Sequence, residues 1–356
     1  MLLVSRIIRK YKYLLNKSYL YLETKKAATQ LKNLDATRPK IFLMCCPIHT
    51  NLGDQAQRLC IERWIKETYP QHQLIASCAR TVPSGYYENV SKILNEKDLI
   101  FIHSGYLFMN DLSDVPAILK IVELYKRNKI IFFPQTVNFS CDEIKQEFVN
   151  SFAQNKNILL LCRDYISYEN AKTLFPNNEC LAFPDIVTSL IGSYHSSQKR
   201  SGVCFCLRND KEKYYSDSDL EKLITKLKTY NCCRIDTTLK LSFCKMNVLR
   251  KKYIYDMVDF LSSKKVVVTD RYHGTIFSII ANTPVVVLNS TDHKLSSGVK
   301  WFPKQIFDKS IYFADDLDEA YDIVTKILTA NVELNNPSYF LEKYFSKLSD
   351  IVKDAN

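Results

Sequence analysis

The residue types best suited to chemistry are in the run DRYHG at positions 270–274. This run follows the apolar segment Val266–Thr269 and precedes a short helical stretch. A strand that ends in this way places the Arg271 cation, the His273 imidazole and the N–H groups of a helix start at one point. An α/β protein holds an anionic ligand at such a point, and a histidine there suits proton transfer near neutral pH. Gly274 alone indicates no ligand, because any strand-to-helix turn favours glycine.

Polar residues also follow several other apolar runs. They are Asn51, Gly53 and Asp54 after the run at 41–46, Gly105 after Leu99–Ile102, Gln135 after 130–133, Arg163 after 158–161, Arg208 after 203–207 and Lys294 after 285–288. Ligands of open α/β sheets bind outside the carboxyl ends of the strands. These residues are therefore predicted to line one cleft.

The segments that must position these residues alternate between strand-like and helix-like patterns. The strand-like runs lie at 41–46, Leu99–Ile102, 130–133 and 158–161, then at 203–207, 233–235, Val266–Thr269, 285–288 and Ile311–Phe313. Helix-length segments such as 54–68 and 115–127 separate them, an order that predicts βαβ units and a mostly parallel sheet. A polar stretch at 193–201 divides the two series.

These patterns predict an α/β protein with two Rossmann-like domains that face each other across a cleft. We expect a basic amphipathic N-terminal arm at 1–39, an N-terminal Rossmann-like domain at 40–195, a C-terminal one at 196–330 and a C-terminal helix at 331–356 that packs back on the body. The length of 356 residues is too great for one ordinary core, and the 46% of hydrophobic residues can fill two.

The composition also indicates in which cellular compartment the protein works. No run approaches the ~18 apolar residues of a spanning helix, and the amino terminus lacks the features of a signal peptide. The twelve cysteines lie mostly in apolar runs without any CxxC pair, as small core residues of a reducing compartment do. We therefore expect a cytoplasmic protein without a metal site.

The net charge of +11 is concentrated at the amino terminus, where residues 1–40 hold ten Lys or Arg and two Asp or Glu. Apolar residues recur there at helical spacing, at Leu3, Ile7, Tyr11, Leu14 and Leu15, with basic residues between them. Such a helix is typical of a surface-lying membrane anchor, here on an anionic membrane surface through residues 1–34. An ordinary helix packed on the body with a solvated basic face has the same pattern. No recognised motif accompanies the charge, so nucleic acid is not a predicted partner.

Several well-known motifs are absent. The chain has no GxGxxG, no GxxxxGK[ST], no HExxH and no GxSxG. The sequence DSD at 217–219 resembles the paired carboxylates that hold a metal-bound nucleotide sugar. It follows Ser216 and opens a helical run, so we interpret it as a helix cap.

The order of the strand ends resembles the polysaccharide pyruvyl transferase family over about residues 40–300. The matching blocks are HTNLGDQA (49–56), FFPQTV (132–137), CRDYISYENAK (162–172), FPDIV (183–187), CLRND (206–210) and TDRYHGTIFSIIANTPVVVL (269–288). The last block is the most specific of them. One departure lies at 103–106, where this chain reads HSGY and the family commonly has a glycine-rich stretch.

The resemblance implies a fold similar to GT-B glycosyltransferases and a reaction in which phosphoenolpyruvate forms a cyclic ketal on a sugar, in capsule or exopolysaccharide biosynthesis. Phosphoenolpyruvate carries a carboxylate and a phosphate, and guanidinium groups match both. The expected roles are phosphoenolpyruvate binding by Arg163, Arg271 and Lys294, proton donation by His273, proton acceptance by Asp54 (less so Asp185), and acceptor or phosphate contacts by Asn51, Gly53, Gly105, Gln135, Arg208 and Gly274. No metal or cofactor is required by this mechanism; phosphoenolpyruvate is the donor substrate.

The family resemblance also implies an acceptor that is a sugar or a lipid-linked oligosaccharide at the inner face of the cell membrane, where the basic arm would hold the enzyme. A GT-B-type nucleotide-sugar glycosyltransferase is the first alternative, since it shares the cleft and the need for cations. A non-catalytic, membrane-associated assembly factor is the second. The donor distinguishes the first two hypotheses, and the joint presence of His273, Arg271 and Arg163 argues against the third.

Overall fold

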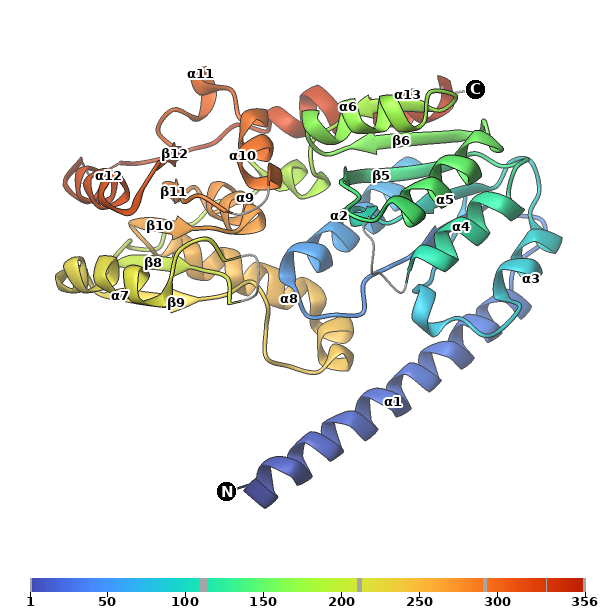
Figure 1. The fold of residues 1–356 in the computed structure, drawn as a ribbon, viewed down its shortest axis with the longest axis horizontal. Helices are drawn as coiled ribbons and strands as arrows, with labels where there is room; N and C mark the ends of the chain where they lie inside the picture. Colours follow the sequence, from blue (N-terminus) through green and yellow to red (C-terminus); the bar gives the residue numbers. More distant parts are fainter. Residues whose placement is uncertain (1, 109–113, 210–212, 291–292, 331, 355–356) are drawn as a thin grey trace.

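The computed structural model describes residues 2–108, 114–209, 213–290, 293–330 and 332–354; of residues 2–16, 293, 294 and 296 only the backbone is described. The chain forms two α/β domains that lie side by side (Figure 1). A long helix, α1 (Leu2–Lys32), extends away from both domains. The predicted α/β class with parallel sheets in two Rossmann-like domains is confirmed.

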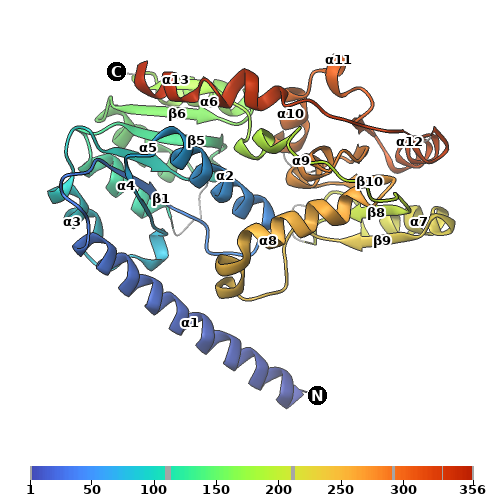
Figure 2. The same ribbon diagram turned by 180° about the vertical axis from the view of Figure 1, so that it is seen from behind.

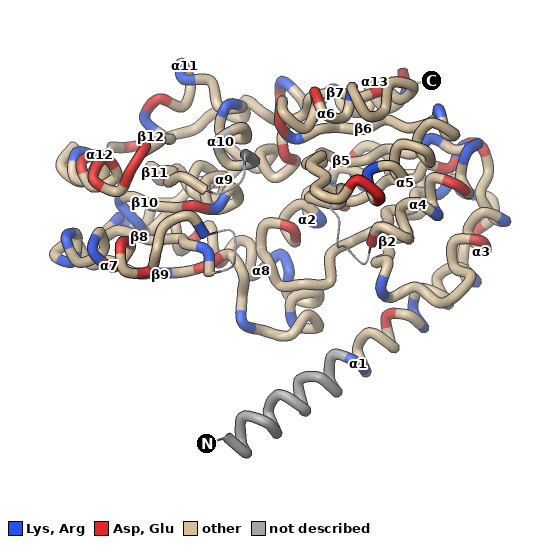
Figure 3. Tube along the Cα trace, viewed as in Figure 1, with Lys and Arg blue, Asp and Glu red and all other residues tan. Residues whose placement is uncertain are grey.

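The N-terminal domain is built on a parallel sheet in which the described strands run in the order β2-β1-β3-β5-β6-β7, with β4 beside β5. The strands are β1 (Lys40–Met44), β2 (Gln73–Ala76), β3 (Leu99–Ile102), β4 (Gly105–Phe108), β5 (Ile130–Val137), β6 (Ile158–Cys162) and β7 (Glu179–Ala182). The helices between them are α2 (Leu52–Thr68), α3 (Tyr86–Ile93), α4 (Val115–Leu124), α5 (Asp142–Ala153) and α6 (Tyr165–Leu174). Figure 3 shows long uncharged stretches along β5 and β6, as expected for strands covered on both faces.

Side chains of this sheet alternate between two apolar layers, because successive residues of a strand point to opposite faces. Phe42 and Met44 pack in one layer with α3, α4 and α5, whereas Ile41 and Leu43 pack in the other layer with α2. The core therefore places the start of α2 at the carboxyl end of β1 and on the side of the sheet that faces the second domain.

The C-terminal domain is a second parallel sheet, with the described strands in the order β12-β11-β10-β8-β9. Its strands are β8 (Val203–Cys206), β9 (Cys232–Ile235), β10 (Val266–Thr269), β11 (Val285–Val287) and β12 (Ile311–Phe313). Its helices are α7 (Asp217–Lys226), α8 (Phe243–Ser262), α9 (Tyr272–Ile280), α10 (His293–Gly298), α11 (Lys304–Phe307) and α12 (Leu317–Ala330). Helices α7 and α12 cover one face, and α8 and α9 cover the face toward the N-terminal domain.

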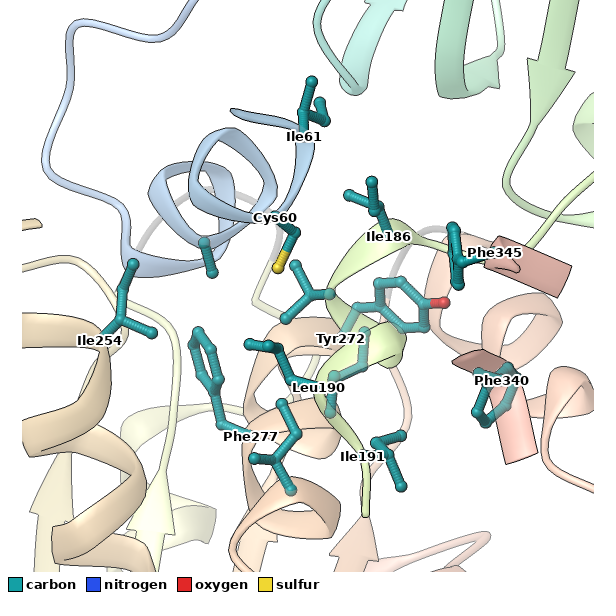
Figure 4. Packing of buried hydrophobic residues seen from close by; sticks show 14 of the residues in the cluster. Cys60, Ile61, Ile186, Leu190, Ile191, Ile254, Tyr272, Phe277, Phe340 and Phe345 are labelled. Atoms are coloured by element: carbon teal, nitrogen blue, oxygen red, sulfur yellow. The ribbon is translucent and has the colours of Figure 1, made fainter. Parts of the chain in front are cut away.

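One apolar core joins the two domains. Figures 1 and 2 show α8 beside α2, and Figure 4 shows Cys60 and Ile61 of α2 in the same cluster as Leu190, Tyr272 and Phe277. The cluster also includes η2 (Ile186–Leu190), the short helical segment in the connection between the sheets.

The C-terminal segment returns to the N-terminal domain after α12. It forms the short helix η5 (Leu341–Phe345) and α13 (Leu348–Asp354). The Trp64 indole Nε1 donates to the Phe345 carbonyl at 3.3 Å, and the rings of Phe183 and Phe345 lie 5.3 Å apart, edge to face. The predicted C-terminal helix thus packs on the first domain, and it covers part of the interdomain core.

The predicted strands recur within one or two residues at most ends, whereas β2, β4 and β7 were not predicted. β5 differs most from the prediction. Pro134, Gln135 and Thr136 were expected to follow a strand, but β5 continues through them to Val137. The register of β5 against β6 shifts between Phe132 and Gln135. Such an irregularity accommodates proline, which cannot donate to a regular ladder.

The basic arm divides into two parts. From Tyr19 onward α1 contacts the body: the Tyr19 ring lies 5.5 Å from that of Phe243, Asn247 Nδ2 donates to Tyr19 Oη at 2.7 Å, and Ala27 is buried. The first half of the helix extends away from the domains (Figure 1). The interpretation as a helix packed on the body therefore holds for the second half of α1, and the membrane anchor stays a prediction. Within the described part of the chain, no helix combines the length and the apolar character that crossing a bilayer would require.

Candidate active site

A cavity of about 250 Å³ lies between the two domains at the ends of their strands. It is lined by Asn51, Asp54, Tyr106 and Arg163 from the N-terminal domain and by Arg208, Asp270, Arg271 and His273, among others, from the C-terminal domain. We call it the arginine cavity. The structure thus brings together most of the residues that the sequence places at strand ends.

His273 lies in the first turn of α9 and faces Asp185 from the other domain. His273 Nε2 is 3.4 Å from Asp185 Oδ2. Asp185 is completely buried; Gln57 Nε2 donates to its Oδ2 at 2.6 Å and the Val187 N–H donates to its Oδ1 at 3.0 Å. This carboxylate lies behind the imidazole and holds it in place, a role that the sequence did not predict for Asp185.

Asp185 remains ionised despite its burial. Burial alone would raise the pKa of this carboxyl, but the neighbouring His273 and Arg163 and the hydrogen bond from Val187 together hold its pKa below the ordinary value. Arg163 Nη1 lies 4.0 Å from Asp185 Oδ2. A fixed negative charge beside His273 compensates the positive charge of a protonated imidazole.

Gly53 allows His273 to reach this position. A Cβ atom at residue 53 would lie 2.1 Å from His273 Nδ1, far inside contact distance. The first turn of α2 can therefore approach the imidazole only because residue 53 has no side chain. Nδ1 therefore faces the first turn of α2. Nε2 lies 3.4 Å from Asp185 Oδ2, is buried and makes no hydrogen bond among the residues that the structure describes.

At position 274 glycine is needed for a different contact than at position 53. A Cβ there would lie 2.4 Å from Thr269 Oγ1 and 3.2 Å from Cys206 Sγ. The glycine lets α9 pack closely on the ends of β8 and β10, so it positions His273 indirectly.

Three buried guanidinium groups line the arginine cavity. Arg271 forms a two-point ion pair with Asp236, with Nε 2.7 Å from Oδ1 and Nη2 donating to Oδ2 at 2.9 Å. Arg163 Nε donates to Thr136 Oγ1, and the Arg208 main-chain N–H donates to Asp270 Oδ1 at 2.9 Å. The side chains of Arg163 and Arg271, held in this way, present planar, fixed hydrogen-bond donors, which suit carboxylate and phosphate.

Trp301 provides a further support for Arg163. The indole Nε1 donates to the Arg163 carbonyl at 2.6 Å. This bond joins a residue of the C-terminal domain to the main chain just after β6, and it fixes the position of the guanidinium relative to the other domain.

Two helix starts also face the arginine cavity. Asn51 caps α2 by accepting from the Gly53 N–H at 2.9 Å, and Arg271 occupies the N-cap position of α9 without a side-chain cap. The N–H groups of an uncapped first turn, with the helix dipole, favour an anion. The site is therefore built to hold a small, multiply charged anion next to an imidazole.

Some predicted site residues lie elsewhere. Gln135 is buried in β5, where Nε2 donates to the carbonyls of His103 at 2.5 Å and Phe133 at 2.8 Å. Its amide is used in joining β4 to β5, not in the arginine cavity. Gly105 begins β4 with a φ of 137° and lines a neighbouring cavity. Lys294 belongs to α10, and its side chain lies outside the described residues.

Sequence reasoning missed Asp236, which holds Arg271. A signal was present, because Asp236 directly follows the predicted strand at 233–235. Among the described residues, no three His, Cys, Asp or Glu side chains gather as a metal ion would need.

The model of the polysaccharide pyruvyl transferase family matches residues 51–293. General stress protein 30 of Bacillus subtilis is 30% identical over 300 residues, covering 82% of this chain and 86% of that protein. Pyruvyl transferase 1 of Schizosaccharomyces pombe is 23% identical over 330 residues, covering 88% of this chain and 80% of that one.

A solved structure shares the fold. HepE from Anabaena, in complex with UDP and glucose, is similar with a TM-score of 0.56 and 10% sequence identity over 89% of this chain and 98% of that chain. This likeness is to the arrangement of two Rossmann-like domains in GT-B-type proteins. Since the family model covers the arginine cavity and more than half of the sequence, the chain belongs to the polysaccharide pyruvyl transferase family and is a transferase.

Proposed function

We propose that the protein transfers the enolpyruvyl group of phosphoenolpyruvate to a sugar of a lipid-linked oligosaccharide and closes it as a pyruvate ketal, in capsule or exopolysaccharide assembly. The observation that carries this proposal is the pairing of His273 with buried Asp185 in a cavity lined by Arg163, Arg208 and Arg271. The arginines match a substrate with one carboxylate and one phosphate, and the imidazole supplies a proton beside them.

The chemistry can be followed atom by atom. Proton transfer from His273 to C3 of phosphoenolpyruvate converts the methylene into a methyl group and leaves a positive charge on C2 and its oxygen. One sugar hydroxyl forms a bond to C2 and gives its proton to a base. A second hydroxyl of the same sugar then bonds to C2, the bond from C2 to the phosphate oxygen breaks, and the second proton leaves with the phosphate.

Asp54 is the carboxylate that we assign to the base. It lies at the start of α2, lines the arginine cavity and keeps 26% of its side chain exposed. His49 Nε2 is 3.6 Å from its Oδ2. Asp185 cannot serve equally well, because it is completely buried behind His273.

The direct test is to incubate the purified protein with phosphoenolpyruvate and lipid-linked oligosaccharides. Phosphate release and the mass of the product are then measured. Release of phosphate together with the mass increase of a pyruvate ketal supports the proposal. Turnover of a nucleotide sugar with the mass increase of a hexose, and none with phosphoenolpyruvate, would replace it with the glycosyltransferase alternative.

Arg208→Lys should weaken binding of the donor. Lysine keeps the charge but loses the planar fork, so we expect the KM for phosphoenolpyruvate to rise about ten- to hundredfold, the loss of one charge-assisted hydrogen bond of about 1.5–3 kcal/mol. The KM for the acceptor should change little. Arg63→Lys is the matched control, because Arg63 pairs with Glu67 on the surface of α2. An unchanged donor KM in Arg208→Lys would remove Arg208 from the donor site.

We also propose that the protein works in the cytoplasm, bound to the anionic inner face of the cell membrane through the free half of α1. Next to this free half, in the part of α1 that contacts the body, Tyr21 and Leu22 are still 59% and 61% exposed, and Val248 at the kinked start of α8 is 75% exposed. Exposed apolar side chains beside basic residues suit a membrane surface.

Deletion of residues 2–16 should release the protein from anionic vesicles. The deletion removes Arg6, Arg9, Lys10 and Lys12 but spares the contacts of Tyr19 and Ala27 with the body. At about 1 kcal/mol for each basic residue near the surface, binding in a vesicle sedimentation assay should fall at least about tenfold. Turnover on soluble acceptors should not change. Undiminished binding of the shortened protein to phosphatidylglycerol vesicles would contradict the anchor.

A further inference from the structure

A second cavity, of about 210 Å³, lies on the N-terminal domain next to the arginine cavity. Its lining includes His49, Asp54, Arg80, His103, Tyr106 and Asp114. Asp54 and Tyr106 also line the arginine cavity, so the two cavities share a wall. We call this second one the His103 cavity.

His103 has one ring nitrogen that is bonded and one that is not. The side chain is 2% exposed, and Nδ1 lies 2.5 Å from the Ser104 carbonyl oxygen. A carbonyl oxygen can only accept, so Nδ1 carries the hydrogen and Nε2 carries a lone pair. Nε2 is buried and has no hydrogen-bond partner among the described residues. Buried polar atoms are nearly always hydrogen-bonded, so this lone pair points to a ligand that donates.

His103 is also neutral at physiological pH. Burial lowers the pKa of the imidazole to about 4. The ring can accept a hydrogen bond under these conditions but is a weak base. It suits the positioning of a hydroxyl group better than the removal of its proton.

The His103 cavity is also lined by Cys45, Cys46, Pro47, Ile48, Cys78 and Leu107, and its polar groups point to the same ligand chemistry. Asp54 and Asp114 contribute carboxyl groups, which accept hydrogen bonds from hydroxyls. Arg80 is close enough to Asp114 to oppose the rise that burial causes in the pKa of that carboxyl, so its charge is partly compensated. These carboxylates would repel a second phosphate group, whereas they would not repel an uncharged ligand with several hydroxyls.

Tyr106 supplies an aromatic wall between the cavities. Asn138 Nδ2 donates to its Oη at 3.0 Å, and the Arg163 guanidinium carbon lies 6.0 Å from its ring centroid. The ring is thus held at the boundary between the two cavities. The apolar C–H face of a sugar packs well against such a ring.

We propose that the His103 cavity binds the uncharged sugar that receives the pyruvyl group, with His103 Nε2 accepting a hydrogen bond from one of its hydroxyls. This inference rests on the proposed function. It places the sugar on the N-terminal domain and the donor at the arginines, with Asp54 at the junction, where the attacking hydroxyl must lose its proton.

The acceptor specificity of this protein should depend on His103 more than on the donor-binding arginines, because His103 lines only the second cavity whereas Arg163, Arg208 and Arg271 line the arginine cavity.

The test compares His103→Asn with His103→Gln. The Asn amide can still donate to the Ser104 carbonyl but does not reach the place of Nε2, so the KM for the oligosaccharide acceptor should rise about five- to hundredfold. The KM for phosphoenolpyruvate should stay unchanged. Gln reaches farther and should restore part of the acceptor affinity. His72→Asn is the matched control, since His72 packs on Tyr69 away from both cavities.

The outcomes separate this inference from the proposed function. If the wild-type protein does not consume phosphoenolpyruvate, the proposed function fails. If it does, and His103→Asn leaves the acceptor KM unchanged or raises only the donor KM, the His103 cavity is not the acceptor site. If the variants do not fold, saturation-transfer NMR tests the inference on the wild-type protein. The ligands are the methyl glycosides of glucose, galactose and mannose. Binding that persists with the phosphoenolpyruvate site filled supports the inference, and no binding overturns it.

Discussion

His273→Gln should lower turnover by about 10²–10⁴-fold, the usual contribution of a positioned acid, and leave the affinity for phosphoenolpyruvate nearly unchanged. Glutamine has similar length but cannot deliver a proton at neutral pH. The guanidinium groups of Arg163, Arg208 and Arg271 remain in the arginine cavity, so the anion should still bind. Phosphate release measures the first effect, and the shift in melting temperature with phosphoenolpyruvate measures the second.

An isotope experiment locates the proton transfer. In D₂O the wild-type protein should place one deuterium in the methyl group of the ketal, since the acid at C3 exchanges with solvent. His195→Gln is the control, because His195 is exposed and lies outside both cavities. Full activity of His273→Gln would assign the acid to another residue.

Asp185→Asn should impair both stability and turnover. The change removes the buried negative charge that compensates Arg163 and His273, and breaking a buried ion pair in this way costs about 3–5 kcal/mol. The amide also fails to stabilise a protonated His273, so kcat should fall while the donor KM changes less. Urea unfolding and steady-state kinetics measure the two effects. Asp308→Asn, at an exposed aspartate, should change neither.

The effect on stability should depend on pH in a defined direction. The folded pKa of Asp185 is below the unfolded value of 3.8, so its contribution is fully present above pH 3.8 and is lost as the pH falls through the folded value. The difference in unfolding free energy between wild type and Asp185→Asn should therefore be constant at neutral pH and shrink below pH 3.8. A difference that stayed constant in acid would mean that another group accounts for it.

Apolar runs were sufficient to predict the strands that build the site. Val266–Thr269 and Leu99–Ile102 match β10 and β3, because buried parallel strands are continuously apolar. The strand-end rule then brought Arg163, Arg208 and His273 to one place, as the arginine cavity shows. The short strand β7 has partly exposed side chains and was not among the predicted strands, although three of its four residues are apolar. Because β7 was not among the predicted elements, Asp185, which follows it, was not among the residues predicted to lie at strand ends.

Tertiary contacts account for what the sequence could not reveal. Gly53 has the local pattern of a helix start, yet its actual constraint is His273, which comes from the other domain. Gln135 has the pattern of a loop residue after a strand, yet the register shift in β5 keeps it inside the sheet. The constraint on Gly53 comes from a distant part of the chain, and the place of Gln135 is set by the pairing of β5 with β6, so local pattern alone predicts neither.

The apolar cluster shared by α2, η2, α8 and α9 has a consequence for motion. Proteins whose domains swing open about a hinge have small, polar interfaces, whereas here Ile61, Leu190 and Phe277 are all buried between the sheets. Separating the domains would expose this core to water, so the two sheets form a single cooperative folding unit. We therefore expect substrates to enter at the rim of the arginine cavity without opening of the domains, with Arg163, Arg271 and His273 held in their present arrangement.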